Sequence, residues 1–97
     1  MSVKPGISPV DIEELRAQSQ RCLIDFLDAE VQLASTFVEA AAMERNQGHS
    51  DHARRTKEQA RKAATAIRHF IDRVQNQEIR DAIARRCDEL DQAVAAL

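Results

Sequence analysis

Between Pro9 and Gly48 the sequence contains no glycine and no proline, and this uninterrupted stretch constrains the fold more than any other feature. These two residues most often mark helix ends, and the 97-residue chain has only two of each. We therefore predict a first helix over residues 9–46, more than about 50 Å long at ~1.5 Å per residue. Apolar residues recur in it at spacings of three and four, forming a stripe wide enough to face two partners. The stripe contains Ile12, Leu15, Cys22, Leu23, Phe26, Leu27, Leu33, Ala34, Phe37, Val38 and Ala41.

A turn around Gly48 separates the first helix from a second one. Glycine often ends a helix, and Ser50 or Asp51 can cap the next helix, which we predict over residues 51–74. Small side chains dominate the first half of its apolar face, so the two helices are expected to approach closely. These small residues are Ala53, Ala60, Ala63 and Ala64.

A third helix is predicted over residues 77–96, with Asn76 as its cap. The fold class is therefore all-α, an antiparallel three-helix bundle with a long first helix. We expect a single domain over residues 9–97. A flexible N-terminal tail is expected over residues 1–8, in which Ser8 caps the first helix.

The remaining composition points to a cytoplasmic protein. No apolar run approaches the roughly 20 residues that span a bilayer, and the N-terminal residues lack the apolar region of a signal peptide, so no membrane contact is expected. Cys22 and Cys87 fit a reducing compartment, where they are expected to be buried packing groups. In a simple antiparallel layout they lie roughly 15 Å apart along the bundle, too far for a disulfide.

A pattern of small residues surrounds the turn between the first two predicted helices. It consists of Gly48, Ala53 and Ala60, with Phe37 and Ala41 on the preceding helix, and the third helix carries the segment IARRCDEL. With these features residues 30–97 resemble two families of helical domains, the tetratricopeptide hairpin and the microtubule-interacting-and-trafficking (MIT) domain. The resemblance implies a closely packed helical hairpin with a third helix against it, and implies no particular partner. The chain departs from the tetratricopeptide pattern at Glu44 and Lys57, and no second repeat follows.

The histidines are the only hint of metal chemistry. His49 and His52 provide at most two ligands, whereas a transition-metal site needs three or four. His69 lies 17 residues beyond His52, about 25 Å away along the same helix. The carboxylates of Asp25 and Asp28 are expected on a solvated helix face. We therefore expect no enzyme, metal or cofactor, and keep a small metal-dependent or redox enzyme as the alternative.

The predicted second helix is basic, while the other two are acidic. Residues 50–75 carry seven bases and three acids, whereas residues 11–46 carry three bases and eight acids. A row of cations follows helical spacing: Arg54, Lys57, Arg61 and Arg68. The row is expected either to pair with acids of the first helix or to bind an acidic or amphipathic helical partner. The candidate acids are Asp25, Asp28, Glu30 and Glu39.

Weak nucleic-acid binding through the same helix is a third possibility. The formal net charge of −2, the pI near 5.9 and the lack of tyrosine and tryptophan argue against it.

The first helix is long enough to project beyond the second by about ten residues. This overhang is expected to expose apolar side chains and to form a homodimer, which would enlarge a small core. The self-association residues are Ile12, Leu15 and Leu23. The alternatives are a bend near Ser19 and Gln20, or a tail that covers the overhang with Val3 and Ile7. The sequence thus predicts a non-catalytic interaction or structural module.

Overall fold

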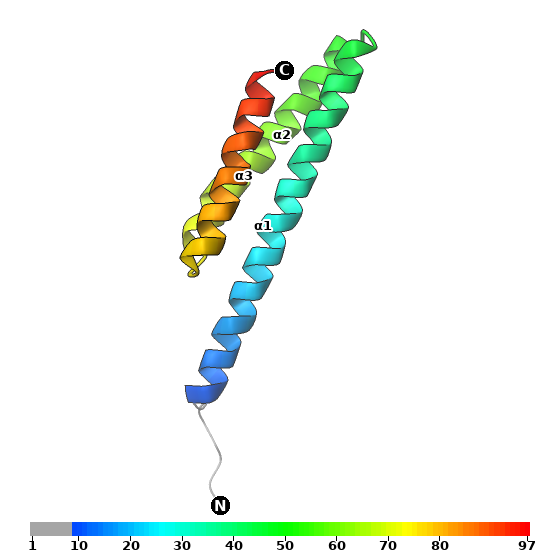
Figure 1. Ribbon diagram of the computed structural model, residues 1–97. Coiled ribbons are helices and arrows are strands. Elements are labelled where there is room, and N and C mark those ends of the chain that lie inside the picture. The colour runs from blue at the N-terminus through cyan, green and yellow to red at the C-terminus, as the bar shows by residue number, and fades with distance from the viewer. Residues whose placement is uncertain (1–8) are drawn as a thin grey trace, which may run out of the picture.

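A computed structural model describes residues 9–97, and residues 1–8, including the predicted tail and the Ser8 cap, lie outside that range. Three α-helices and one short 3₁₀ helix account for nearly all of it. They are α1 (Pro9–Asn46), α2 (Ser50–Phe70), η1 (Ile71–Arg73) and α3 (Gln77–Ala95). Figure 1 shows α2 and α3 packed alongside the C-terminal part of α1, which confirms the all-α bundle with a long first helix.

The turn between α1 and α2 depends on Gly48, as predicted. Its φ of 82° lies in the left-handed region, which glycine adopts without steric cost. The N–H of Gly48 donates to the carbonyl of Arg45 (3.1 Å), and the N–H of His49 donates to that of Glu44 (2.8 Å). This hydrogen-bond pair is the Schellman motif, which satisfies carbonyls at the end of a helix.

The predicted cap of α2 was wrong by one or two residues. His49 occupies the cap position and its side chain makes no capping hydrogen bond, whereas Ser50 and Asp51 already lie inside the helix. The cause is the compact turn, since the carbonyl of His49 accepts from the N–H of Ala53 (2.9 Å) as soon as the Schellman motif is closed. Asp51 instead places a negative charge in the first turn, where it interacts favourably with the positive end of the helix dipole.

The start of α3 is as predicted. The side chain of Asn76 accepts a hydrogen bond from the N–H of Ile79 (3.0 Å), which satisfies a donor that the first turn leaves free.

The end of α2 differs from a regular helix end, because its last turn tightens into η1 before the backbone becomes extended at Val74. Such tightening is common at helix ends.

The core lies where all three helices meet. Its buried residues are Leu27, Val31 and Ala34 from α1, Ala63, Ala64 and Ile67 from α2, Val74, and Ile83, Cys87 and Leu90 from α3. Ala53 and Ala60 are also buried, in keeping with the close approach of α1 and α2 that the small residues predict. Beside them, the Thr56 hydroxyl donates to Glu44 Oε1 (2.9 Å), so the charged group at position 44 joins the two helices.

One glutamine marks where the bundle stops. The amide Nε2 of Gln20 donates to the carbonyl of Arg73 (2.9 Å), and its Oε1 accepts from the N–H of Gln75 (2.9 Å). Both ends of the side chain therefore bind the connection between α2 and α3. Before Gln20, α1 continues for eleven residues with no helix beside it, as the blue segment in Figure 1 shows.

Candidate interaction surfaces

The overhang of α1, defined here as Pro9–Ser19, exposes apolar side chains as predicted. Every residue from 11 to 19 is exposed, and 37% of Ile12 and 50% of Leu15 remain accessible. The alternative of a bend near Ser19 is wrong, because α1 runs through this position as one unbroken helix. The alternative of cover by Val3 and Ile7 falls on residues outside those that the structure describes.

Leu23 differs from the prediction that it shares this exposure. It is partly buried and packs against the core cluster, because it lies one turn beyond Gln20, where α2 and α3 already flank the helix. Leu23 therefore belongs to the edge of the core, and Ile12 and Leu15 are the predicted self-association residues that protrude.

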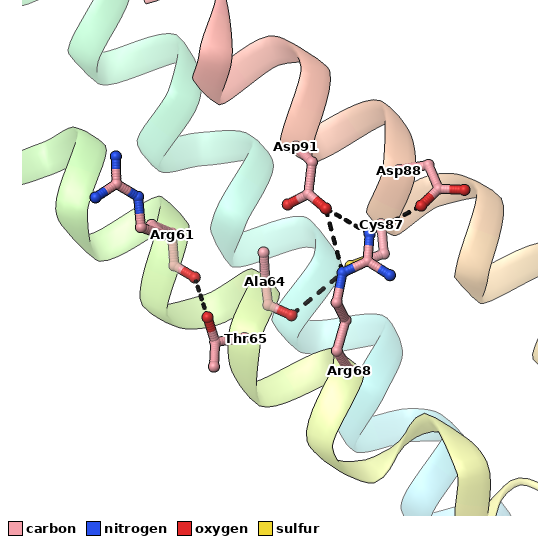
Figure 2. Close-up of polar contacts among 7 residues, drawn as sticks. All are labelled: Arg61, Ala64, Thr65, Arg68, Cys87, Asp88 and Asp91. Atoms are coloured by element: carbon pink, nitrogen blue, oxygen red, sulfur yellow. Dashed lines mark hydrogen bonds and ion pairs between the residues drawn. The ribbon is translucent and has the colours of Figure 1, made fainter.

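Of the four cations in the basic row of α2, only Arg68 binds acids of the third helix among the described residues. Figure 2 shows Arg68 reaching across to α3, where its Nη2 donates to Asp88 Oδ1 (2.8 Å) and its Nε donates to Asp91 Oδ2 (3.2 Å). These hydrogen bonds to Asp88 and Asp91 raise the pKa of Arg68 further above its already high value. All three side chains are about half exposed, so solvent weakens each pair, and the guanidinium mainly fixes α3 against α2.

The other three cations of the row point elsewhere. Arg61 is directed away from the cluster in Figure 2 and pairs with Glu58 one turn earlier on its own helix (3.0 Å). Arg54 and Lys57 line a shallow pocket beside Leu97, at the end of the bundle formed by the α1–α2 turn. An acidic partner or a nucleic acid on this row remains a prediction.

The predicted pairing of the row with acids of α1 was wrong. The described contacts join none of the four cations to Asp25, Asp28, Glu30 or Glu39. Asp28 is bound by Arg86 of α3 instead. The reason is geometric for Arg68, because it lies on the side of α2 that faces α3, so Asp88 and Asp91 of α3 supply its carboxylates.

The two cysteines have opposite surroundings, and only one fits the prediction of buried thiols. Cys87 is fully buried, and its Sγ lies 3.7 Å from the carbonyl of Ala64. Figure 2 marks this contact with a dashed line. Burial raises the pKa of the Cys87 thiol, which keeps it protonated. Cys22 is exposed on α1, so the prediction was wrong for this residue, and the two thiols are free.

The histidines occupy surface positions around α2. The rings of His49 and His52 have centroids 6.2 Å apart, and His69 packs edge-to-face on Phe70 at 4.7 Å. Within residues 9–97, no three His, Cys, Asp or Glu side chains gather in a way that could hold a metal ion.

The class that the fold defines is an all-α three-helix bundle in which, among the helices that the structure describes, none packs against the overhang of α1. Comparisons with protein-family models, with curated proteins and with solved structures gave no match. The resemblance to tetratricopeptide and MIT domains therefore stays a prediction. Along the part of the chain that the structure describes, no helix combines the length and the apolar character that crossing a membrane requires.

Proposed function

We propose that this chain is a non-catalytic helical interaction module that self-associates through the N-terminal part of α1. The observation that carries the proposal is the overhang itself. Eleven residues of α1 extend beyond Gln20, and they present Ile12 and Leu15 to solvent. Apolar side chains that protrude together from one side of a helix typically mark a protein contact.

The size of the bundle supports the same proposal. A chain of 97 residues builds only a small core, and here alanine and one cysteine supply much of it. Small domains often gain stability by burying further apolar surface in an oligomer. A two-fold dimer would cover both overhangs with one set of contacts.

Light scattering coupled to size-exclusion chromatography tests this proposal. We expect the wild-type chain to have about twice its monomer mass of 10.9 kDa. We expect Leu15→Asp to yield the monomer, because a buried carboxylate without a partner opposes association.

Ala17→Asp is the matched control, because it adds the same charge to the overhang about 160° around the helix from Leu15. It should leave the dimer intact. A wild-type monomer at high concentration, or a Leu15→Asp dimer as tight as the wild type, would refute the proposal.

A further inference from the structure

The exposed apolar residues of α1 do not end with the overhang. Five large apolar side chains are exposed in the described structure, and all five lie on α1. They are Ile12 (37%), Leu15 (50%), Phe26 (42%), Leu33 (44%) and Met43 (61%). They run over nearly the whole helix, a distance of about 47 Å at ~1.5 Å per residue.

These residues follow a strict seven-residue repeat. Counting in sevens from Ile12 gives Ile12, Ser19, Phe26, Leu33 and Ala40, and counting from Leu15 gives Leu15, Cys22, Ala29, Thr36 and Met43. Nine of these ten positions are exposed and Ala40 is half-buried. We call these ten positions the outer seam. Two apolar positions per seven residues are the pattern by which helices pair in a coiled coil.

A second seven-residue repeat on α1 faces the core, which leaves the outer seam outside it. The core-facing residues of α1 also repeat at seven, and they include Leu27, Ala34 and Ala41. At ~100° per residue the two sets lie roughly 140° apart around the helix. The inner set is covered by α2 and α3, whereas the outer seam lies beside the bundle: the ring of its Phe26 packs edge-to-face on Phe70 of α2 (5.7 Å), and 42% of Phe26 stays exposed.

From this geometry we infer that the outer seam pairs with the outer seam of a second copy, as an antiparallel coiled coil along α1. The inference rests on the proposed self-association and adds its orientation and register. The facing pairs are centred on the peptide bond between Leu27 and Asp28, so the two-fold axis of the dimer passes beside this point of each α1. In this register all ten seam positions are used at once, and no part of the overhang is left without a partner.

Side-chain size supports the antiparallel register. Facing pairs join a large residue to a small one: Leu15 to Ala40, Leu33 to Cys22 and Phe26 to Ala29 of the second copy. Alternation of large and small side chains fills the space between two helices evenly. The hydroxyls of Ser19 and Thr36 also face each other, and Ile12 faces Met43 at the ends.

Charges beside the seam oppose the parallel alternative. In a parallel pair, Asp25 would lie beside Glu30 of the second copy and Glu39 beside its Glu44, each contact occurring twice. Only Asp11 beside Arg16 would offset this repulsion. The antiparallel register places Asp25 beside Gln32 and Glu39 beside Gln18, so no acid meets an acid. Flanking charges of this kind commonly set helix orientation.

Longer-range charge also favours a second copy as the occupant. In the antiparallel register each overhang lies alongside the end of the partner helix that packs on the first half of α2. Residues 11–19 carry three acids and one base, whereas residues 50–62 carry five bases and two acids. The two segments are separated by about one helix diameter of ~10–12 Å, close to the screening length of about 8–10 Å. The acidic overhang is thereby attracted to a basic surface of the same protein.

Disulfide trapping at the seam tests orientation and register together. Two helices whose axes are about 8–10 Å apart bring facing Cα atoms to about 4–6 Å, the range that a disulfide needs. We expect brief oxidation with diamide to cross-link Leu33→Cys, because the new thiol faces Cys22 of the second copy. The apparent mass should then double on a non-reducing gel.

Two controls define the register. The wild-type chain should stay uncross-linked, because its Cys22 residues are about 16 Å apart along the axis in the antiparallel pair, and Cys87 is buried. The double variant Leu33→Cys with Cys22→Ser should also stay uncross-linked. Circular dichroism of each variant checks that the helices are retained.

The possible outcomes separate this inference from the proposed function. A covalent dimer of the wild type, or of the double variant, would show a parallel pair and overturn the inference. A Leu33→Cys protein that is dimeric by light scattering but not cross-linked would contradict the antiparallel pairing of the outer seams, while the proposed self-association would still hold. A chain that is monomeric by light scattering would overturn both.

Discussion

The thiols of Cys22 and Cys87 show how much a single side chain depends on its position in the bundle. Cys22 is exposed on the outer seam, while Cys87 is enclosed by the core and has a raised pKa because of its burial. Both lie in apolar stripes of the sequence, which is why both were expected to be buried. A stripe shows that a residue lies on an apolar side of its helix, but it does not show which side a neighbouring helix covers.

This difference should be measurable as thiol reactivity in the Leu15→Asp chain, in which the outer seam is expected to be free. We expect Cys22, which is exposed, to react quickly with a thiol reagent such as DTNB. Cys87 should react only on unfolding, because its burial blocks the reagent and raises the pKa of the thiol, and the thiolate is the reactive form. Stopped-flow absorbance should show one fast equivalent in buffer and a second in denaturant. Cys22→Ser should remove the fast equivalent alone. Two fast equivalents in buffer would contradict the buried position of Cys87.

At the scale of the element, two helix boundaries could be predicted from a single residue each. Gly48 and Asn76 act through backbone geometry and a local hydrogen bond, so neither depends on distant residues. The cap of α2 was misplaced because Ser50 and Asp51 are good capping residues by type. The Schellman motif at Gly48 nevertheless brings the chain into the helix before either is reached.

Replacement of Gly48 tests the first of these local signals. Gly48→Ala should lower the free energy of unfolding by about 1–2 kcal/mol, because a side chain in the left-handed region is strained even though nothing lies within 4 Å of the new methyl group. Gly48→Asn should cost less, since asparagine tolerates this region better. Urea unfolding monitored by circular dichroism measures both. An Ala variant as stable as the wild type would show that the turn rearranges without cost.

The contacts between elements were less predictable than the elements. The sequence pattern placed the basic row on one side of α2, but it is compatible with a third helix on either side of the α1–α2 hairpin. The structure places α3 on the side of the row, so Arg68 binds Asp88 and Asp91, and Asp28 of α1 binds Arg86. Periodicity carries no information on this handedness, and the prediction of pairs between the row and α1 failed for that reason.

For the whole molecule, the proposed dimerisation would make stability depend on protein concentration. A tenfold rise in concentration favours the dimer by about 1.4 kcal/mol, and 1 kcal/mol shifts the melting temperature by about 2–4 °C for a unit of roughly 200 residues. We therefore expect the melting temperature of the wild type to rise by several degrees over that range. Differential scanning calorimetry of wild type, Leu15→Asp and Ala17→Asp provides the comparison. Leu15→Asp should melt at one temperature throughout, and a wild type that does the same would count against a folded dimer.

The fixing of Gln20 by the α2–α3 connection has a consequence for how the dimer forms. Isolated helices shorter than about 12–15 residues are marginal in water, and the overhang has eleven. In a single chain we therefore expect its turns to fray from the N-terminus toward Gln20, where two side-chain hydrogen bonds hold the helix to the α2–α3 connection. In the proposed dimer, ordering of the overhang and association would then occur as one event. Such a dimer would have a lower net affinity than its contact area alone would give, because part of the interaction free energy orders the chain.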